Sequence, residues 1–385
     1  GYLGWPTAMY FSNKGYDVTV VDNYFRRNAC RELDASTLFP VPDLIERAKT
    51  WYQITGKEIK VVIGNLTIPE ITRKLFNGNI NYNWCLNNKF TGIPETVVHF
   101  AEQPSAPYSL INYKYADITL TNNLRVTNNL MWALKDFSRD THMIKLGTMG
   151  EYGTPNIDIE EGWIEIKHKG RKDKFLYPRQ ASSLYHTTKI MDTDLLWFGV
   201  RMWGLKVTDL MQGPVYGIDT EETKIDDRLK TIFNYDEIFG TIINRFICQA
   251  IIGHPLTIYG KGGQTRGYIN IKDTLQCIHK SSLKPPKPGE LNIFNQITEI
   301  FSVNQIAKKI YEVGVKRNHQ VKISHIENPR IELEEHYYNP VFQGLREIGV
   351  KPNFLTDDII NEIFKIVEKY HKNIHKEIIL KGIKW

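Results

Sequence analysis

Short apolar runs alternate with longer amphipathic stretches through the first half of the chain. The short runs are rich in Val, Ile and Thr and predict strands buried on both faces, while the stretches between them predict helices. The predicted strands are residues 17–23, 59–64, 96–100 and 143–146, and the predicted helices include residues 44–53 and 122–137. This alternation predicts an α/β fold with a doubly wound parallel sheet, whose ligands bind beyond the carboxyl ends of the strands.

After residue 210 the pattern changes to segments punctuated by Gly and Pro and mixed with helices. Helices are predicted at residues 239–251 and 357–371, and a return to the sheet is predicted near residues 274–277 and 291–295. A chain of 385 residues is long enough for about two domains. We therefore predict a sheet domain of residues 1–210 that also receives residues 269–300, and a smaller, mixed C-terminal substrate-binding lobe of residues 211–268 and 301–385.

The chain opens on Gly1 and Gly4, with Tyr2 and Leu3 between them, and Asp22 ends the first predicted strand. A Gly-x-x-Gly turn, a helix, a strand and an acid about 20 residues on form the later part of a Rossmann-type dinucleotide-binding fingerprint. The first strand and first glycine of that fingerprint would precede Gly1, so we expect the numbering to start inside a longer chain. An ordinary turn at the two glycines is the alternative.

The residues after this strand bear on the choice of cofactor. The Asp22 carboxylate can accept both ribose hydroxyls of an adenosine, which favours NAD over NADP. Arg26 and Arg27 are the opposing consideration, because a guanidinium can accommodate a 2′-phosphate. We expect NAD, held by the opening turn together with Asp22, Asn23 and Arg26.

The spacing of Tyr185 and Lys189 carries the strongest chemical signal in the chain. Residues four apart lie on one face of a helix, so the ammonium can sit beside the phenol and lower its pKa toward neutrality. Thr148, at the end of a predicted strand, can orient a substrate alcohol while Tyr185 removes its proton and a nicotinamide takes the hydride. Tyr-x-x-x-Lys alone is weak, since a chain of this length can contain one by chance.

Composition excludes several classes of protein. The chain is 42% hydrophobic and 24% charged, as in ordinary globular proteins, and no apolar run approaches the about 18 residues of a membrane span. Its net charge of +6 is spread out, which suits nucleotides better than nucleic acid. The densest basic stretch, residues 167–174, is interpreted as a hairpin tip. The four cysteines are far apart, so we expect no metal site or disulfide framework, and a reducing compartment.

A glycine-rich segment at residues 260–268 is predicted to form an exposed loop that carries Gln264 and Arg266. Arg266 can bind a sugar-nucleotide diphosphate through two hydrogen bonds, whereas the spacing does not match a P-loop. Arg330 offers a second guanidinium further on. The nearby His336 is interpreted as a packing or surface residue rather than a metal ligand.

These motifs together resemble the extended short-chain dehydrogenase/reductase superfamily of nucleotide-sugar enzymes, and within it the synthases that form UDP-sulfoquinovose. The resemblance covers essentially the whole chain, and its most specific segments are residues 21–23, 105–109, 146–162, 185–186, 262–268 and 335–339. It implies an NAD-dependent reaction of UDP-glucose and sulfite through 4-keto and 5,6-ene intermediates. It also implies substrate contacts from Thr148, Tyr185, Gln212, Gln264, Arg266 and Arg330, and a homodimer formed through helices that flank the sheet.

One local difference separates this chain from 4,6-dehydratases. Their sequences have Thr-Asp-Glu at the positions where this chain has Thr148, Met149 and Gly150. Another group must then move the protons on carbons 5 and 6. His186 is the candidate, because its reference pKa is close to neutral, and Glu151 is the less favoured one. A packed or surface histidine is the alternative for His186.

Three departures from the pattern of these synthases concern the expected cleft. Pro104 stands where an arginine is common, and Met211 stands where an asparagine precedes Gln-Gly. Asn65 stands where aspartate is usual, at a position that the resemblance assigns to the adenine of the cofactor. We expect Pro104 and Met211 to touch the substrate cleft and to alter the acceptor or anion site.

Two other functions remain open at this point. A UDP-hexose 4-epimerase or 4,6-dehydratase of the same fold would turn over UDP-glucose without sulfite. A non-catalytic NAD-binding scaffold would not require Thr148, Tyr185 and Lys189 together. We expect the enzyme to be cytoplasmic, or to lie in an organelle lumen if a targeting peptide has been removed, and to need neither a membrane nor nucleic acid.

Overall fold

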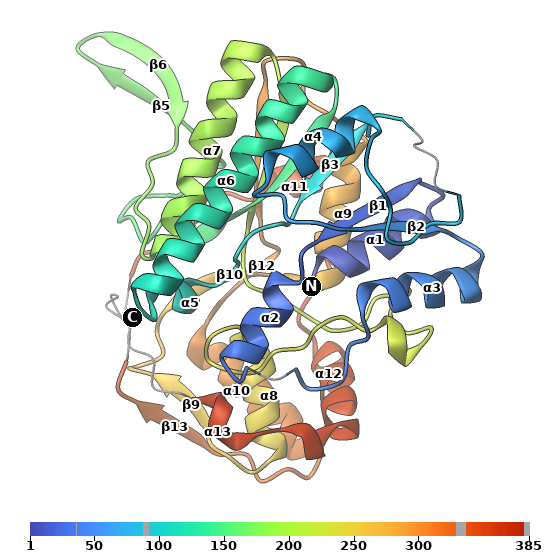
Figure 1. Ribbon diagram of the computed structural model, residues 1–385. Helices are drawn as coiled ribbons and strands as arrows, with labels where there is room; N and C mark the ends of the chain where they lie inside the picture. The colour runs from blue at the N-terminus through green and yellow to red at the C-terminus, as the bar shows by residue number, and fades with distance from the viewer. Residues whose placement is uncertain (36, 88–91, 329–335, 381–385) are drawn as a thin grey trace.

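The computed structural model describes residues 1–35, 37–87, 92–328 and 336–380, and two of its sheets contain the strands predicted in the first half of the chain; both sheets are parallel. The four-stranded sheet has the order β11-β7-β4-β3. A second sheet pairs β1 with β2 (Figure 1). The bounds are β1 Val18–Asp22, β2 Ile59–Ile63, β3 Thr96–His99, β4 His142–Thr148, β7 Lys206–Gln212 and β11 Leu291–Gln296. Among the described residues no strand lies between β1 and β3, and a cavity extends into the space that separates them.

The register of the central strands decides which side chains meet at the carboxyl edge. β4 pairs with β7 so that Lys145 lies opposite Asp209 and Thr148 lies opposite Gln212. β3 pairs with β4 so that His99 lies opposite Lys145. Because all of these strands are parallel, the residues that follow them gather at one edge of the sheet, as the sequence predicted.

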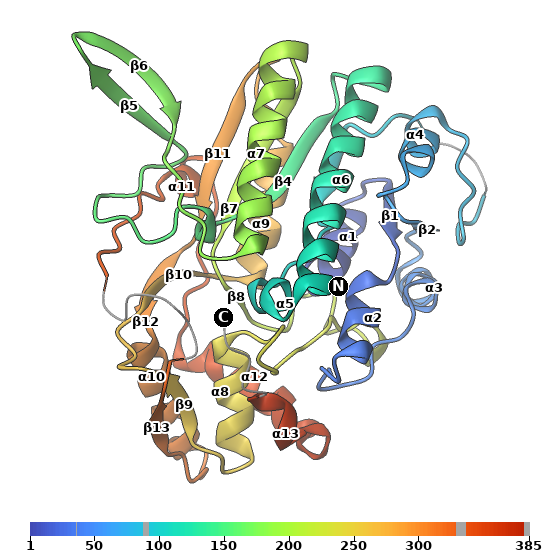
Figure 2. The same ribbon diagram turned by 60° about the vertical axis from the view of Figure 1, so that its left-hand side comes forward.

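Helices cover both faces of the four-stranded sheet. The helices of this domain are α1 Gly4–Asn13, α2 Phe25–Glu32, α3 Leu44–Thr55, α4 Pro69–Asn77, α5 Ala106–Leu110, α6 Tyr113–Phe137, α7 Leu184–Trp203 and α9 Ile271–Ser282. Met143 of β4 packs with residues of α6 and α7, whereas its neighbour Ile144 packs with residues of α9. Successive side chains of a strand point to opposite faces, so both must be apolar when both faces are covered. Figure 2 shows α6 and α7 side by side in front of the sheet.

A second portion has its own apolar core beneath the sheet domain (Figure 1). Its strands are β8 Val215–Tyr216, β9 Leu256–Tyr259, β10 Thr265–Asn270, β12 Glu299–Ser302 and β13 Ile323–Ile326. Its helices are α8 Ile242–Ile251, α10 Val303–Lys316, α12 Asp357–Lys369 and α13 Lys376–Ile379, with α11 Gly344–Glu347 nearer the sheet domain. The described part of the chain also contains three single 3₁₀ turns: η1 Met149–Glu151, η2 Asp227–Leu229 and η3 His371–Asn373.

The structure confirms most of the predicted elements and corrects three. The four early strands, the helix at residues 44–53 and the return of residues 291–295 to the sheet are all present. Residues 274–277 do not form a strand, because they lie within α9, which packs on the sheet instead of joining it. Arg266 lies in β10 rather than in a loop, and Gln264 just before it is buried. The long helix α6 begins at Tyr113, nine residues before the predicted start at residue 122.

The predicted hairpin at residues 167–174 is confirmed. Strands β5 Trp163–His168 and β6 Arg171–Leu176 pair antiparallel and project from the body of the protein (Figure 2). The connecting residues Lys169 and Gly170 both have positive φ, at 46° and 77°, which is the backbone of a tight two-residue turn.

Two glycines with the same backbone conformation provide a test of packing near the carboxyl edge. Gly153 and Gly253 have φ of 67° and 68°. A Cβ at Gly153 would lie 2.2 Å from the Gln180 carbonyl oxygen, whereas nothing lies within 4 Å of one at Gly253. The left-handed backbone costs both alanine variants about 1–2 kcal/mol. We expect Gly153→Ala to lower the melting temperature by at least about 4 °C more than Gly253→Ala in a calorimetric scan. Equal melting temperatures would contradict the clash.

Candidate active site

One large cavity, of about 1540 Å³, opens at the carboxyl edge of the sheets and reaches the second portion of the chain. Its walls contain these residues singled out in the sequence: Gly1, Tyr2, Leu3, Gly4, Asp22, Asn23, Arg26, Asn65, Thr148, Tyr185, His186, Gln212, Gln264 and Arg266. Lys189 is buried directly behind this wall, and Arg330 lies outside the described residues. Residues from strands, helices and loops far apart in sequence thus face one space.

Thr148 ends β4 and begins the 3₁₀ turn η1. Its hydroxyl oxygen accepts a hydrogen bond from the Gly150 N–H at 3.2 Å, and its own N–H donates to the Glu151 carboxylate at 3.3 Å. This reciprocal cap fixes the side chain. Because the hydroxyl oxygen already accepts a bond, its proton remains to be donated toward a substrate oxygen.

Tyr185 lies in the first turn of α7. Ser183 caps this helix by accepting the His186 N–H at 3.1 Å, and the Tyr185 N–H donates to the Ser109 hydroxyl at 3.1 Å. Burial raises the pKa of the Tyr185 phenol, and the carboxylates of Glu102 and Glu151 raise it further. Both effects oppose ionisation of the phenol in this arrangement.

Burial makes the predicted lowering of the Tyr185 pKa wrong for this arrangement, and the contacts of Lys189 show why its charge does not reverse the effect. The Lys189 ammonium lies 5.9 Å from the centre of the Tyr185 ring. It donates to the Leu146 carbonyl at 2.6 Å and pairs with a Glu102 carboxylate oxygen at 2.5 Å. The glutamate offsets the positive charge that would otherwise favour the phenolate. The sequence pattern could not reveal this partner, because Glu102 follows a different strand.

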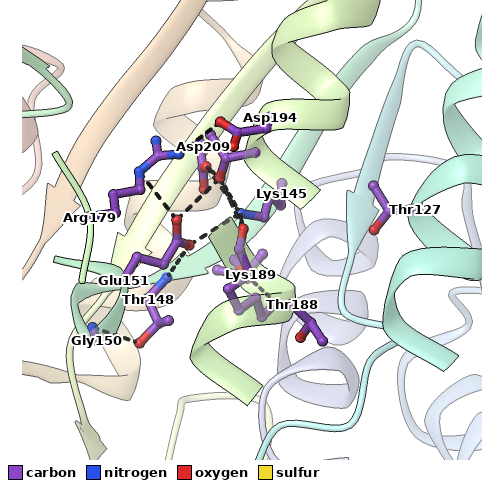
Figure 3. A network of polar contacts seen from close by, with 12 residues as sticks. Thr127, Lys145, Thr148, Gly150, Glu151, Arg179, Thr188, Lys189, Asp194 and Asp209 are labelled. Atoms are coloured by element: carbon purple, nitrogen blue, oxygen red, sulfur yellow. Dashed lines mark hydrogen bonds and ion pairs between the residues drawn. The ribbon is translucent and has the colours of Figure 1, made fainter. Parts of the chain in front are cut away.

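A second buried ammonium joins α7 to the sheet (Figure 3). Lys145 of β4 lies 2.6 Å from the Thr193 hydroxyl, 3.1 Å from Asp209, 3.3 Å from Glu151 and 3.0 Å from the Lys189 carbonyl. Burial favours the neutral amine, but the two carboxylates outweigh it and raise the pKa of Lys145. Sequence analysis missed this cluster. Its signal was Lys145 and Asp209, a charged residue in the middle of each of two neighbouring strands.

Glu151 belongs to that cluster and not to the cavity. Its carboxylate pairs with Lys145 and lies 3.7 Å from the Arg179 guanidinium, and its side chain is fully buried. It is not among the residues that line the cavity. The less favoured interpretation of Glu151 as a proton-transfer group is therefore wrong, and its observed contacts cap Thr148 and balance Lys145.

His186 does line the cavity, and it fits there because its neighbour Gly150 has no side chain. Its ring packs against Gly150 so closely that a Cβ there would lie 2.3 Å from the imidazole Nε2. Its Nδ1 lies 3.2 Å from the Ser182 hydroxyl, and its ring centre lies 5.1 Å from that of Tyr185. Any side chain at residue 150 would take the space of the imidazole. This contact accounts for the glycine that distinguishes the chain from the dehydratase pattern.

The opening turn provides a site whose chemistry fits a dinucleotide. Helix α1 starts at Gly4, its N-terminus has no capping side chain, and its first residues line the cavity. Uncapped N–H groups at a helix N-terminus suit a phosphate. Asp22 ends β1 at the cavity, where one carboxylate oxygen accepts the Tyr24 N–H at 2.6 Å. A second carboxylate oxygen is left for hydroxyl groups.

Two other predicted cofactor residues lie in the same wall, but their side chains already make hydrogen bonds within the chain. Arg26 donates to the Asn234 side chain at 2.8 Å and lies 3.4 Å from the centre of the Phe239 ring. Asn65 accepts the Thr67 N–H at 3.0 Å through its side chain. Arg26 is therefore directed toward the second portion of the chain rather than held beside Asp22.

The predicted substrate residues approach the cavity from the other side. The Gln212 amide donates to Gln296 at 3.0 Å, and Gln264 is buried with a side-chain oxygen that has no hydrogen-bond partner among the described residues. The Arg266 guanidinium contacts the His336 ring at 2.9 Å. Arg245 was not predicted, although it also lines the cavity, and its guanidinium lies 5.1 Å from the centre of the Tyr259 ring.

The two departures expected at the cleft have different outcomes. Pro104 lines the cavity, as expected. Met211 does not, because it is fully buried in the apolar core behind β4 and β7. In the part of the chain that the structure describes, no group of His, Cys, Asp and Glu side chains has the geometry to hold a metal ion, and no helix is long and apolar enough to cross a membrane.

Comparison with known proteins identifies the family. Residues 1–295 match the model of the NAD dependent epimerase/dehydratase family. The chain is 44% identical over its full length to the chloroplastic UDP-sulfoquinovose synthase of Spinacia oleracea, of which it covers 77%. The chain belongs to the UDP-sulfoquinovose synthase family. It is also 39% identical over its full length to the UDP-sulfoquinovose synthase of Sulfolobus acidocaldarius, of which it covers 95%.

Solved structures confirm the α/β fold at much lower identity. UDP-glucose 4-epimerase from Bifidobacterium longum, in complex with NAD+ and UDP, has a TM-score of 0.69 at 19% identity, with 97% of each chain covered. UDP-glucuronic acid 4-epimerase from Bacillus cereus, in complex with UDP-glucuronic acid and NAD, has a TM-score of 0.67 at 17% identity, with 96% of each chain covered. Membership of the family confirms that the protein is an NAD-dependent, nucleotide-sugar-modifying enzyme.

The contact between Gly150 and His186 can be tested with a double-mutant cycle. Gly150→Ala should displace the imidazole, and the predicted proton-transfer role of His186 then implies that turnover of UDP-glucose and sulfite falls at least about 10-fold. His186→Ala should have a similar effect, and the double variant should be no slower than His186→Ala alone. Mass-spectrometric assay of the product gives the rates. Additive losses would contradict an effect of Gly150 through His186.

Proposed function

We propose that the protein converts UDP-glucose and sulfite into UDP-sulfoquinovose and water. The observation that carries this proposal is that Thr148, Tyr185 and His186 lie together on one cavity wall. Gly150 makes room for the imidazole at a position where dehydratases have an acidic residue. Full-length identity of 44% to a UDP-sulfoquinovose synthase supports it. NAD, when bound, supplies a hydride acceptor and donor for carbon 4 of the sugar.

The residues of the chain divide the chemistry between them. Thr148 donates a hydrogen bond to the carbon 4 hydroxyl, and Tyr185 accepts its proton as the carbon loses its hydride. The resulting ketone acidifies the proton on carbon 5. His186 removes that proton and passes it to the departing carbon 6 hydroxyl, which leaves as water. The product of these steps is an enone.

The second half of the cycle restores the alcohol. Bisulfite adds through sulfur to carbon 6, and the proton that it brings is delivered to carbon 5 by His186. Hydride then returns to carbon 4, while Tyr185 returns its proton to the carbon 4 oxygen. Atoms balance, because one hydroxyl leaves as water and one sulfonate is gained.

Residues on the two sides of the cavity hold the two ligands. Cofactor binding is assigned to the opening turn of residues 1–4 and to Asp22, Asn23, Arg26 and Asn65, with Tyr185 and Lys189 at the nicotinamide end. Substrate binding is assigned to Thr148, Tyr185, Gln212, Gln264, Arg266 and Arg330. Guanidinium groups suit the diphosphate of a UDP-sugar, which supports Arg266 and adds Arg245 as a further candidate.

The proposal includes the division of the chain into residues 1–210 with 269–300, and residues 211–268 with 301–385. Separate apolar cores support it: one core joins α8, α10 and α12, and others join the sheet to its flanking helices. The cavity between these parts would then receive the cofactor from one side and the sugar nucleotide from the other. We also propose a cytoplasmic location, with an organelle lumen as the alternative that the chloroplastic relative suggests.

A reaction assay distinguishes this function from the alternatives. UDP-glucose incubated with the purified protein and NAD should give a product with the mass of UDP-sulfoquinovose only when sulfite is present. Tyr185→Phe should lower the rate at least about 100-fold while NAD binding is unchanged, because only the transferable proton is lost. Sulfite-independent epimerisation or loss of water would favour a 4-epimerase or 4,6-dehydratase. Bound NAD without turnover would favour a scaffold.

The outer face of α6 and α7 supports the homodimer that we propose. Trp132, Phe198 and Met202 are 42%, 44% and 63% exposed on these adjacent helices. Large apolar side chains exposed together on one surface are typical of a protein interface.

Introducing charge on this face tests the dimer. A variant with Phe198→Glu and Met202→Glu should sediment as a monomer where the unmodified protein sediments as a dimer, because buried unpaired carboxylates oppose association. Phe354→Glu, at a side chain that is 48% exposed, is the matched control and should remain dimeric. A double variant that stays dimeric would place the interface elsewhere.

A further inference from the structure

Two arginines follow Asp22, and each could accommodate the 2′-phosphate that distinguishes NADP from NAD. Both Arg26 and Arg27 belong to α2, the helix that comes directly after β1 and its terminal aspartate. Arg26 lines the cavity, and Arg27 is not among the residues that line it. The preference of the chain for NAD therefore depends on what holds these two guanidinium groups.

The guanidinium of Arg27 is held by residues close to it in the sequence. It donates to the Pro42 carbonyl at 2.7 Å and lies 5.5 Å from the centre of the Tyr24 ring. These contacts keep it out of the cavity wall.

The guanidinium of Arg26 is held by a segment of the second portion of the chain. It donates to the side-chain oxygen of Asn234 at 2.8 Å and lies 3.4 Å from the centre of the Phe239 ring. A guanidinium is attracted to the face of an aromatic ring and stacks on it. Arg26 would have to lose both a hydrogen bond and a stacking contact in order to turn toward Asp22.

Both partners of Arg26 are themselves fixed. The buried Asn234 amide donates to the Ala35 carbonyl at 3.3 Å, which directs its oxygen toward the guanidinium. The buried Asp236 carboxylate accepts the Ile238 and Phe239 N–H groups at 2.9 and 2.7 Å. A side chain that accepts from the backbone in this way stabilises a turn, and this turn presents the Phe239 ring.

We propose that Asn234 and Phe239 determine the specificity of this protein for NAD, because they hold Arg26 away from the ribose 2′ position and leave the Asp22 carboxylate to face it. A carboxylate accepts hydrogen bonds from the 2′-hydroxyl of NAD and repels the 2′-phosphate of NADP. The inference rests on the proposed function in one respect, the assignment of Asp22 to the adenosine ribose. It makes cofactor choice depend on a contact between the two portions of the chain.

Binding of the two nucleotides measures this effect without turnover. The full chain, freed of bound nucleotide, is titrated calorimetrically with NAD and with NADP. The ratio of the Kd for NADP to the Kd for NAD isolates the 2′-phosphate, because the two molecules are otherwise identical. Asn234→Leu should lower this ratio at least about 3-fold, since a released guanidinium forms charge-assisted hydrogen bonds with a phosphate. Adding Phe239→Leu releases the ring contact as well and should lower the ratio at least about 10-fold.

The two arginines provide matched controls in the double variant. Arg26→Leu should remove the gain in NADP binding, whereas Arg27→Leu should leave it intact. If the double variant does not fold, Asn234→Leu with and without Arg26→Leu gives the same comparison. An unchanged ratio in Asn234→Leu, a gain that survives Arg26→Leu, or a gain that disappears with Arg27→Leu would overturn the proposal.

Asp22→Asn tests the assignment on which the inference rests. It should weaken NAD binding at least about 10-fold, because the carboxylate no longer accepts both ribose hydroxyls. An unchanged Kd for NAD in this variant would contradict the proposed cofactor site and the inference with it. An unchanged ratio in Asn234→Leu would overturn the inference alone, and the sulfite-dependent reaction is decided by its own assay.

Discussion

The arrangement of the reaction centre depends on the buried ammonium of Lys145. This side chain crosses from β4 to α7 and meets Asp209 of the neighbouring strand and the carbonyl of Lys189 on the helix. The desolvation cost of such a charge is large, and it is offset only because every direction around the ammonium offers an oxygen. Removing one partner from a buried ion pair costs about 3–5 kcal/mol, so these elements are locked in register. The contacts of Lys145 therefore also fix Thr148 on the strand relative to Tyr185 on the helix.

The same elements carry a second ion pair that sets the chemistry of the phenol. Lys189 is held by Glu102 from the segment after β3, and the pKa of Tyr185 is raised by burial and by that carboxylate. A Tyr-x-x-x-Lys spacing is commonly taken to mean an acidic phenol. Here burial decides the direction of the shift, and a charge from outside the helix adds to it. The catalytic state of a side chain therefore depends on all the charged groups that face it and not on its sequence motif alone.

Room for a side chain matters as much as charge. Solved structures at 17% and 19% identity share the fold, and a fold alone does not fix the reaction. In this chain Gly150 leaves space that the His186 imidazole fills, and Gly147 lies close to the Asp209 carboxylate. Interiors are closely packed, so a single Cβ at either glycine would displace a functional or structural group.

The sequence by itself determined most of the local elements and most of the residues that line the cavity. The strand predicted at residues 59–64 is β2, because a short apolar run predicts a buried strand. The spacing of Tyr185 and Lys189 alone places them on one face of a helix. Tertiary structure decided what no local pattern contains: that residues 274–277 form part of a helix, that Met211 faces the core, and that Glu102 forms an ion pair with Lys189. These outcomes depend on contacts between segments far apart in the chain, where packing and paired charges override local preference.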